Sequence, residues 1–198
     1  VEQAVLGLRA AIGELLYQRA ERIPRGEARI AGLLEAAEAL EPYDSMRAVT
    51  ALRLALDEAA RLPADLGWAL LVLEEAGRIN PTLPAELASE IEEPGRQAAA
   101  LTAAGALTDA LKAAQSIRDP WARAEAVLAV AEAGPTRERL EALMAALQSL
   151  PPGQGRDGKV REALSAALSL GGREGLASAE SFAALAARLD TTAWARAR

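Results

Sequence analysis

The 198-residue chain contains no cysteine and no histidine, and these two absences exclude most of the side-chain chemistry that enzymes use. Without cysteine there is no disulfide, no thiolate nucleophile and no thiolate zinc site. Without histidine there is no imidazole base, no Ser-His-Asp triad and no histidine ligand for a metal. We therefore expect a protein that is not an enzyme and that holds neither a cofactor nor a metal.

Long apolar runs and an excess of positive charge are also missing. The longest apolar runs, such as residues 68–73, are six residues long, whereas a helix needs about 20 to span a bilayer. The net charge is −6, whereas proteins that bind nucleic acids or anionic membranes present basic surfaces. We expect neither kind of partner.

The start of the chain shows no basic segment followed by an apolar one, as a secretory leader would. We expect a soluble protein with a cytoplasmic location. Because the chain starts at Val1 rather than at Met, periplasmic and secreted locations stay open. The 20 arginines against 2 lysines, with a single asparagine, favour a bacterial source and are also found in thermophiles.

Alanine and leucine, by contrast, are abundant, with 49 and 31 copies. Both have high helix propensity. Apolar residues recur at helical spacing along the whole chain, and no segment alternates as a half-buried strand does. The sequence therefore predicts an all-α fold of about ten helices, each about 10–20 residues long.

Two apolar segments lead to specific expectations. Val5, Leu8, Ile12, Leu15 and Leu16 form one stripe at helical spacing. Residues 66–73 are apolar nearly all round, which predicts the most buried helix of the chain. We accordingly expect Leu70→Ala to cost about 2–5 kcal/mol of stability.

Prolines recur at a fixed distance, which indicates a repeat. Pro24 and Pro63 are 39 residues apart, and the same distance separates Pro42 from Pro81 and Pro81 from Pro120. Asn80-Pro81 and Asp119-Pro120 each place an N-cap residue before a proline at the first helical position. A period of about 39 residues with two helices in each repeat is typical of an α-solenoid.

The clearest repeat runs from Ala104 to Gly134, with Gly105 early in its first helix and Asp119-Pro120 at the start of its second. Alanines occupy the positions where adjacent hairpins would cross. This segment resembles the helical-hairpin repeats of the tetratricopeptide and HEAT classes, and the resemblance covers about residues 22–134. It implies a right-handed α–α superhelix of about five antiparallel hairpins, with a concave groove that binds other proteins. The tetratricopeptide pattern of Trp, Leu-Gly and Tyr is absent, so no binding residue is carried over.

We expect residues 1–198 to form a single α-solenoid domain, with a flexible linker over 151–158 before a helical cap over 159–198. The segment 153–159 also spells GxGxxG and GxxxxGK, glycine patterns that wrap phosphate at a helix N-terminus. No strand precedes it, and Val160 replaces the hydroxyl residue that would reach Mg²⁺. We interpret it as an exposed linker with Asp157 capping the next helix, and keep nucleotide binding and hydrolysis as less favoured functions.

Three glutamates are candidates for binding a partner. Glu86, Glu90 and Glu93 follow one another at i, i+4 and i+7, on one face of an expected helix. They form either a solvated outer face or the acidic wall of a groove that attracts a basic segment.

Two aromatic residues follow prolines at matching repeat positions, Tyr43 after Pro42 and Trp121 after Pro120. They are interpreted as packed first-turn side chains, with a partner-binding platform as the alternative.

Arg19, Arg22, Arg25 and Arg29 crowd around Pro24, with two glutamates, Glu21 and Glu27, interleaved among them. We expect surface ion pairs here rather than a phosphate site.

The predicted function is that of a protein- or peptide-binding scaffold that uses a helical-repeat groove. The alternative is a self-associating structural subunit, whose oligomeric state the sequence does not fix. The two differ in where apolar surface is exposed, which is the groove for a binding module and the chain ends for a subunit.

Overall fold

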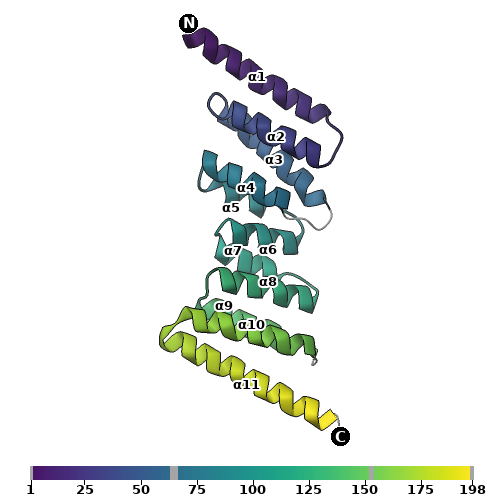
Figure 1. Ribbon diagram of the computed structural model, residues 1–198, viewed down its shortest axis with the longest axis vertical. Helices are drawn as coiled ribbons and strands as arrows, with labels where there is room; N and C mark the ends of the chain where they lie inside the picture. The colour runs from purple at the N-terminus through teal and green to yellow at the C-terminus, as the bar shows by residue number, and fades with distance from the viewer. Residues whose placement is uncertain (1, 63–66, 152–153, 197–198) are drawn as a thin grey trace. The chain divides into compact units, whose positions relative to one another are not determined.

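The structure is a computed structural model that describes residues 2–62, 67–151 and 154–196, with side chains described for 7–62, 67–151 and 155–188. All regular structure in these ranges is α-helical, in eleven helices with no strand (Figure 1). The predicted all-α fold class is therefore confirmed. The chain divides into two compact units, Val1–Arg96 and Gln97–Arg198, which are described separately.

The first unit is a series of helices in which each of the first four packs on the next one in the chain. They are α1 (Glu2–Arg22), α2 (Glu27–Leu40), α3 (Ser45–Arg61), α4 (Gly67–Ile79) and α5 (Leu83–Ser89), followed by α6 (Pro94–Ala103), which continues past the end of the unit. The most extensive contacts are those of α2 with α1 and with α3, so α2 lies between its neighbours (Figure 1).

Small residues bring α1 and α2 close together. A Cβ atom added to Gly13 would lie 2.9 Å from a side-chain carbon of Leu40, and one added to Gly32 would lie 3.3 Å from the Cβ atom of Ala20. Ala20 and Tyr17 are buried on the same side of α1 as Gly13. Small side chains permit short distances between helix axes, and here they determine which side of α1 faces the unit.

The helix over residues 66–73 is not buried all round. In α4, Ala69, Val72 and Leu73 face the interior, whereas Leu70 is 42% exposed and Leu71 is 49% exposed. The prediction that Leu70 is a core residue is therefore wrong. A helix in a layered stack is covered by its neighbours on part of its circumference only, so a helix that is apolar all round leaves leucines on the surface.

The predicted caps are confirmed in one case and wrong in the other. The Asp119 carboxylate accepts a hydrogen bond from the backbone N–H of Ala122 at 2.7 Å, and α8 begins at Pro120. The Asn80 side chain instead accepts from the backbone N–H of Thr82 at 3.0 Å, in a turn that precedes the start of α5 at Leu83. Pro81, which was predicted to start a helix, therefore lies in a turn.

The second unit contains the remaining helices. They are α7 (Leu107–Gln115), α8 (Pro120–Ala133), α9 (Arg137–Gln148), α10 (Gln154–Leu170) and α11 (Gly172–Arg196). α7 and α8 form the hairpin predicted around Asp119-Pro120, but Gly105 lies in the turn before it with φ 75° rather than within a helix. Only glycine adopts this backbone conformation without strain.

The linker expected over 151–158 is largely helical. α10 begins at Gln154, so residues 154–158 form its first turns, and Asp157 lies within the helix instead of capping it. Pro152 and Gly153 lie outside the described residues. None of the described helices is long and apolar enough to cross a membrane.

Candidate functional site

The three candidate glutamates do not share one helix. α5 ends at Ser89, so Glu86 lies in the helix, Glu90 caps its C-terminus and Glu93 precedes the next helix. Pro94 explains the break, because the residue before a proline is displaced from the helical region. The prediction of a single acidic helix face is therefore wrong.

Each of these carboxylates has a partner within the first unit. Glu93 accepts hydrogen bonds from the backbone N–H groups of Gly95, at 2.9 Å, and Arg96, at 2.7 Å, at the start of α6. Glu90 holds the guanidinium of Arg53 on α3 through two bonds of 2.7 and 2.8 Å, which raise the pKa of Arg53. Glu86 accepts a hydrogen bond from the hydroxyl of Thr82.

Glu90 and Glu93 do border a hollow, of about 560 Å³, beside α3. Its other charged walls are also paired, because Arg61 binds Asp57 at 2.7 Å. In the part of the chain that the structure describes, Glu92 is the one acid of this hollow with no hydrogen bond or ion pair. A basic ligand would therefore have to compete with arginines that already hold the other carboxylates.

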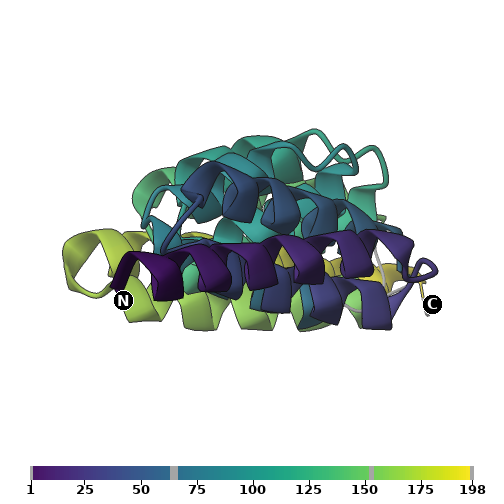
Figure 2. The same cartoon turned by 90° about the horizontal axis from the view of Figure 1, so that it is seen from above.

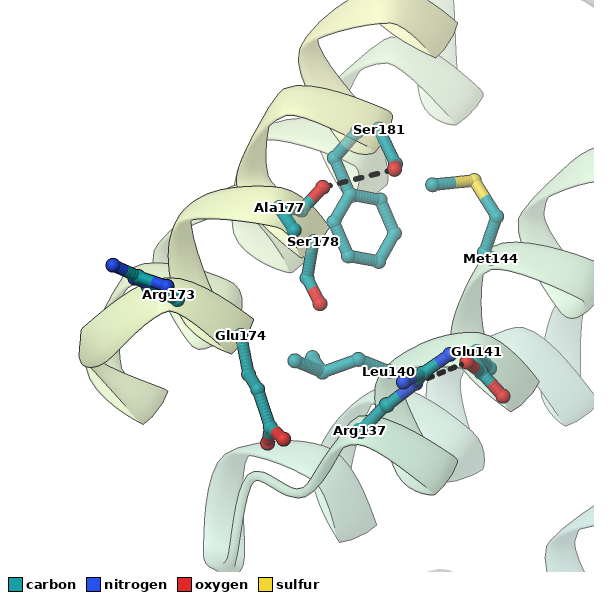
Figure 3. A pocket seen from close by; sticks show the side chains of 10 residues that line it. Arg137, Leu140, Glu141, Met144, Arg173, Glu174, Ala177, Ser178 and Ser181 are labelled. Carbon is teal, nitrogen blue, oxygen red and sulfur yellow. Dashed lines mark hydrogen bonds and ion pairs between the residues drawn. The ribbon is translucent and has the colours of Figure 1, made fainter.

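A second hollow, of about 440 Å³, lies between α9 and α11 in the second unit (Figure 3). Its apolar lining comes from Leu140, Met144, Ala177 and Phe182. Polar groups also line it: Arg137, Glu141, Arg173, Glu174, Ser178 and Ser181.

The polar groups of this second hollow form no catalytic arrangement. Arg137 binds Glu141 at 2.8 Å, which raises the pKa of Arg137, and the Ser181 hydroxyl donates to the backbone carbonyl of Ala177. Arg173 points away from the hollow in Figure 3. Neither serine has the adjacent base that would activate it as a nucleophile. The described residues also contain no cluster of three or more acids that could hold a metal ion.

Two residues of the glycine pattern over 153–159, Gly155 and Lys159, contact other side chains of the second unit. A Cβ atom added to Gly155 would lie 2.9 Å from the indole ring of Trp121, so this glycine makes room for the aromatic ring of α8. The ammonium of Lys159 lies 3.0 Å from Glu162 and 3.6 Å from Glu125, and the hydrogen bond to Glu162 raises its pKa. Trp121, in the first turn of α8, and Tyr43, in the turn before α3, are both half-buried.

The most distinctive surface of the first unit is on α1. Leu8, Ile12 and Leu15 follow one another at helical spacing along one side of α1, and they are 63%, 46% and 64% exposed. We call these three residues the outward stripe. It lies opposite the buried Gly13, Tyr17 and Ala20. Figure 2 shows α1 in purple, with no other helix of the first unit in front of it. Three large apolar side chains in succession are thus left on the surface of the first unit.

Two arginines extend the outward stripe. Counting from Ile12, Leu15, Arg19 and Arg22 follow at steps of three, four and three, so all of them lie on one side of α1. Among the described residues, Arg19 and Arg22 form no ion pair, and the same holds for Arg25 and Arg29. The expectation of ion pairs with Glu21 and Glu27 is therefore wrong.

The carboxylates of α1 lie on a different side of the helix. Glu14 binds Arg47 of α3 at 2.7 Å, and the same guanidinium lies 4.8 Å from the ring centre of Tyr17. Burial, and next the carboxylate of Glu21, raise the pKa of the Tyr17 hydroxyl. Both acids of α1 whose side chains are described thus point towards their own unit, and the outward side is left apolar and basic.

One structural residue escaped the sequence analysis. Glu58 on α3 is buried, and its side chain accepts a hydrogen bond of 3.0 Å from the backbone N–H of Gly26 in the turn between α1 and α2. The signal was an acid directly before Ala59 and three residues after Ala55, two buried alanines of α3. This bond ties the turn that follows Arg22 to the middle of the unit.

Comparison of the chain with models of protein families, with curated proteins and with solved structures finds no match. The resemblance to tetratricopeptide and HEAT repeats therefore stays a prediction. Function has to be argued from the surfaces described above.

Proposed function

We propose that this chain is a protein-binding scaffold and that the outward stripe of α1 receives a helical segment of its partner. One observation carries the proposal: Leu8, Ile12 and Leu15 form a regular apolar stripe that the first unit leaves exposed. Contiguous apolar residues rimmed by polar ones are typical of protein interaction sites.

The spacing of the stripe supports a helix as the bound element. Steps of four and three residues from Leu8 to Leu15 are those of a helix seam, in which apolar side chains interlock with those of a second helix. The stripe runs along a convex helix and not inside a cavity, so it suits an extended partner better than a small molecule.

We further propose that the helices follow the expected right-handed superhelix of about five antiparallel hairpins, of the tetratricopeptide-like kind. In such a frame a helix adds to a neighbouring helix through an apolar face. A partner helix on α1 would add to the first unit in the same manner.

Self-association is the second candidate, because the first helix and the last two helices all expose apolar side chains, and exposure at the chain ends is the distribution expected of a self-associating subunit. Leu168 on α10 is 55% exposed and Leu176 on α11 is 60% exposed. These side chains stand singly, whereas those of α1 form a stripe, so a partner of a different kind is the first choice.

A photoreactive amino acid at position 15 tests the proposal in an extract of the source organism. We expect one predominant cross-linked protein from position 15 and none from the matched control position, the exposed Gln115 of α7. Cross-linked homodimers from position 15, with no other product, would support self-association. Equal yields from both positions would contradict a binding role for the outward stripe.

A further inference from the structure

We propose that the partner segment is an acidic amphipathic helix, whose apolar side chains cover the outward stripe and whose carboxylates bind Arg19 and Arg22. This inference rests on the proposed function and adds the chemistry of the partner to it. The stripe and the two arginines form one continuous surface, which we call the docking face of α1.

The geometry of α1 places the apolar and basic parts of the docking face in line. The five residues Leu8, Ile12, Leu15, Arg19 and Arg22 follow at alternating steps of four and three. Successive steps of this kind keep side chains within about a third of a turn of one another. A helix that lies along the stripe therefore meets both guanidinium groups beyond Leu15.

No acid of the first unit whose side chain the structure describes neutralises these arginines. Both are exposed, and neither forms a hydrogen bond or an ion pair with any side chain that the structure describes. The nearest acids of α1 are engaged elsewhere, since Glu14 binds Arg47 and Glu21 lies beside Tyr17. By comparison, Arg47, Arg53 and Arg61 of the same unit each have a carboxylate within 2.7 Å.

The helix dipole accounts for positive charge here but not for its position. Cations in the last turn are stabilising because the C-terminal end of a helix carries partial negative charge. That effect would be the same on any side of the last turn, whereas both arginines lie on the side of the apolar stripe. Charge complementarity then selects carboxylates on the partner, since like charges at an interface are strongly disfavoured.

This chemistry differs from that expected from the sequence for the glutamates of the first hollow, where the predicted ligand is basic. In that hollow Arg53 and the N-terminus of α6 already satisfy Glu90 and Glu93. On the docking face the unpaired charge is positive, although the chain as a whole is acidic with a net charge of −6.

Two synthetic peptides test the inference with the full-length chain. Both are about 15 residues long, enough to cover the docking face, and share one leucine seam at heptad spacing. One carries glutamate at its other positions and the second carries lysine. Fluorescence anisotropy of the labelled peptides gives the dissociation constants. We expect the glutamate peptide to bind at least about tenfold more tightly than the lysine peptide.

Three variants connect this preference to the docking face. The double variant Arg19→Glu, Arg22→Glu should weaken the glutamate peptide about tenfold and remove its advantage. Arg173→Glu is the matched control, because Arg173 is exposed and forms no bond among the described residues; it should change binding less than twofold. Ile12→Gln should weaken both peptides.

The outcomes separate the inference from the proposed function. The acidic partner would be overturned if the two peptides bind equally, or if the glutamate peptide binds the double variant as tightly as the unchanged chain. If Ile12→Gln still weakens binding in that case, the outward stripe remains a binding surface. If neither peptide binds, or if Ile12→Gln has no effect on either, both the inference and the proposed function are wrong.

Discussion

At the scale of single residues, the structure distinguishes a glycine whose position has no room for a larger side chain from one whose position has room. Gly155 and Gly158 belong to the same pattern and both lie in α10, yet their surroundings differ. A Cβ atom at position 155 would come within 2.9 Å of Trp121, whereas nothing lies within 4 Å of one at position 158. The pattern that resembles a phosphate-binding loop is therefore explained, at Gly155, by helix packing.

This difference predicts opposite effects of two alanine substitutions. Gly158→Ala should stabilise the protein by about 0.5–1 kcal/mol, because alanine restricts the unfolded chain and favours the helix. Gly155→Ala should lose that gain, and should destabilise the protein by about 1–3 kcal/mol if Trp121 cannot shift. Chemical denaturation of both variants gives the two free energies. A gain at position 155 as large as that at position 158 would show that Trp121 does not pack there.

Predictions at this scale succeeded where a side chain acts on its own backbone. Asp119 before Pro120 is a local signal, and the structure has the cap at the predicted residue. Asn80 before Pro81 carries almost the same signal, but its oxygen accepts from Thr82 within a turn. A helix N-cap and a turn each give the side-chain oxygen of Asp or Asn a hydrogen bond from a nearby backbone N–H. The packing around the turn therefore decides which of the two forms.

At the scale of one helix, the apolar composition of α4 gives a wrong prediction of which of its side chains are buried. Its continuous apolar run predicts burial on every side, but in a layered unit only the face towards the neighbouring helices is covered. Leu70 and Leu73 are three residues apart in this helix, and the first is 42% exposed whereas the second is 4% exposed.

The two leucines therefore form an internal comparison for stability. We expect Leu73→Ala to cost about 2–5 kcal/mol, because it leaves a cavity in the core of the first unit. Leu70→Ala should cost less than about 1 kcal/mol. Thermal or urea unfolding measures both. Equal costs would mean that a further surface covers Leu70 in solution.

The direction of α1 could not be predicted from its own pattern. The hydrophobic stripe suggests that Leu8, Ile12 and Leu15 face the core, but α1 packs through Gly13, Tyr17 and Ala20 instead. Short side chains permit the close approach to α2, and this contact outweighs the larger apolar area of the leucines. The sequence of α1 shows two sides that could pack on another helix. Only the neighbouring helices show which side is buried and which stays exposed.

At the scale of the whole molecule, the fold class is the prediction that the structure confirms. The shortage of strand-forming patterns and the wealth of alanine and leucine predicted an all-α chain, and all regular structure in the described ranges is helical. The charge distribution was less informative. Glu86, Glu90 and Glu93 suggested an acidic wall, but Arg53 binds Glu90, and the backbone N–H groups of Gly95 and Arg96 bind Glu93. Pairing depends on which helices meet, and a single sequence does not contain that information.

The central claim is that α1 turns its apolar stripe outward for a partner and does not use it to hold the chain together. The most direct test is the free energy of unfolding of Leu15→Gln, since glutamine keeps high helix propensity but is polar. We expect a change below about 0.5 kcal/mol, while Leu33→Ala, at a fully buried position of α2, costs about 2–5 kcal/mol. A loss of about 2 kcal/mol or more for Leu15→Gln would show that the stripe is part of the folded core and would contradict a docking face on α1.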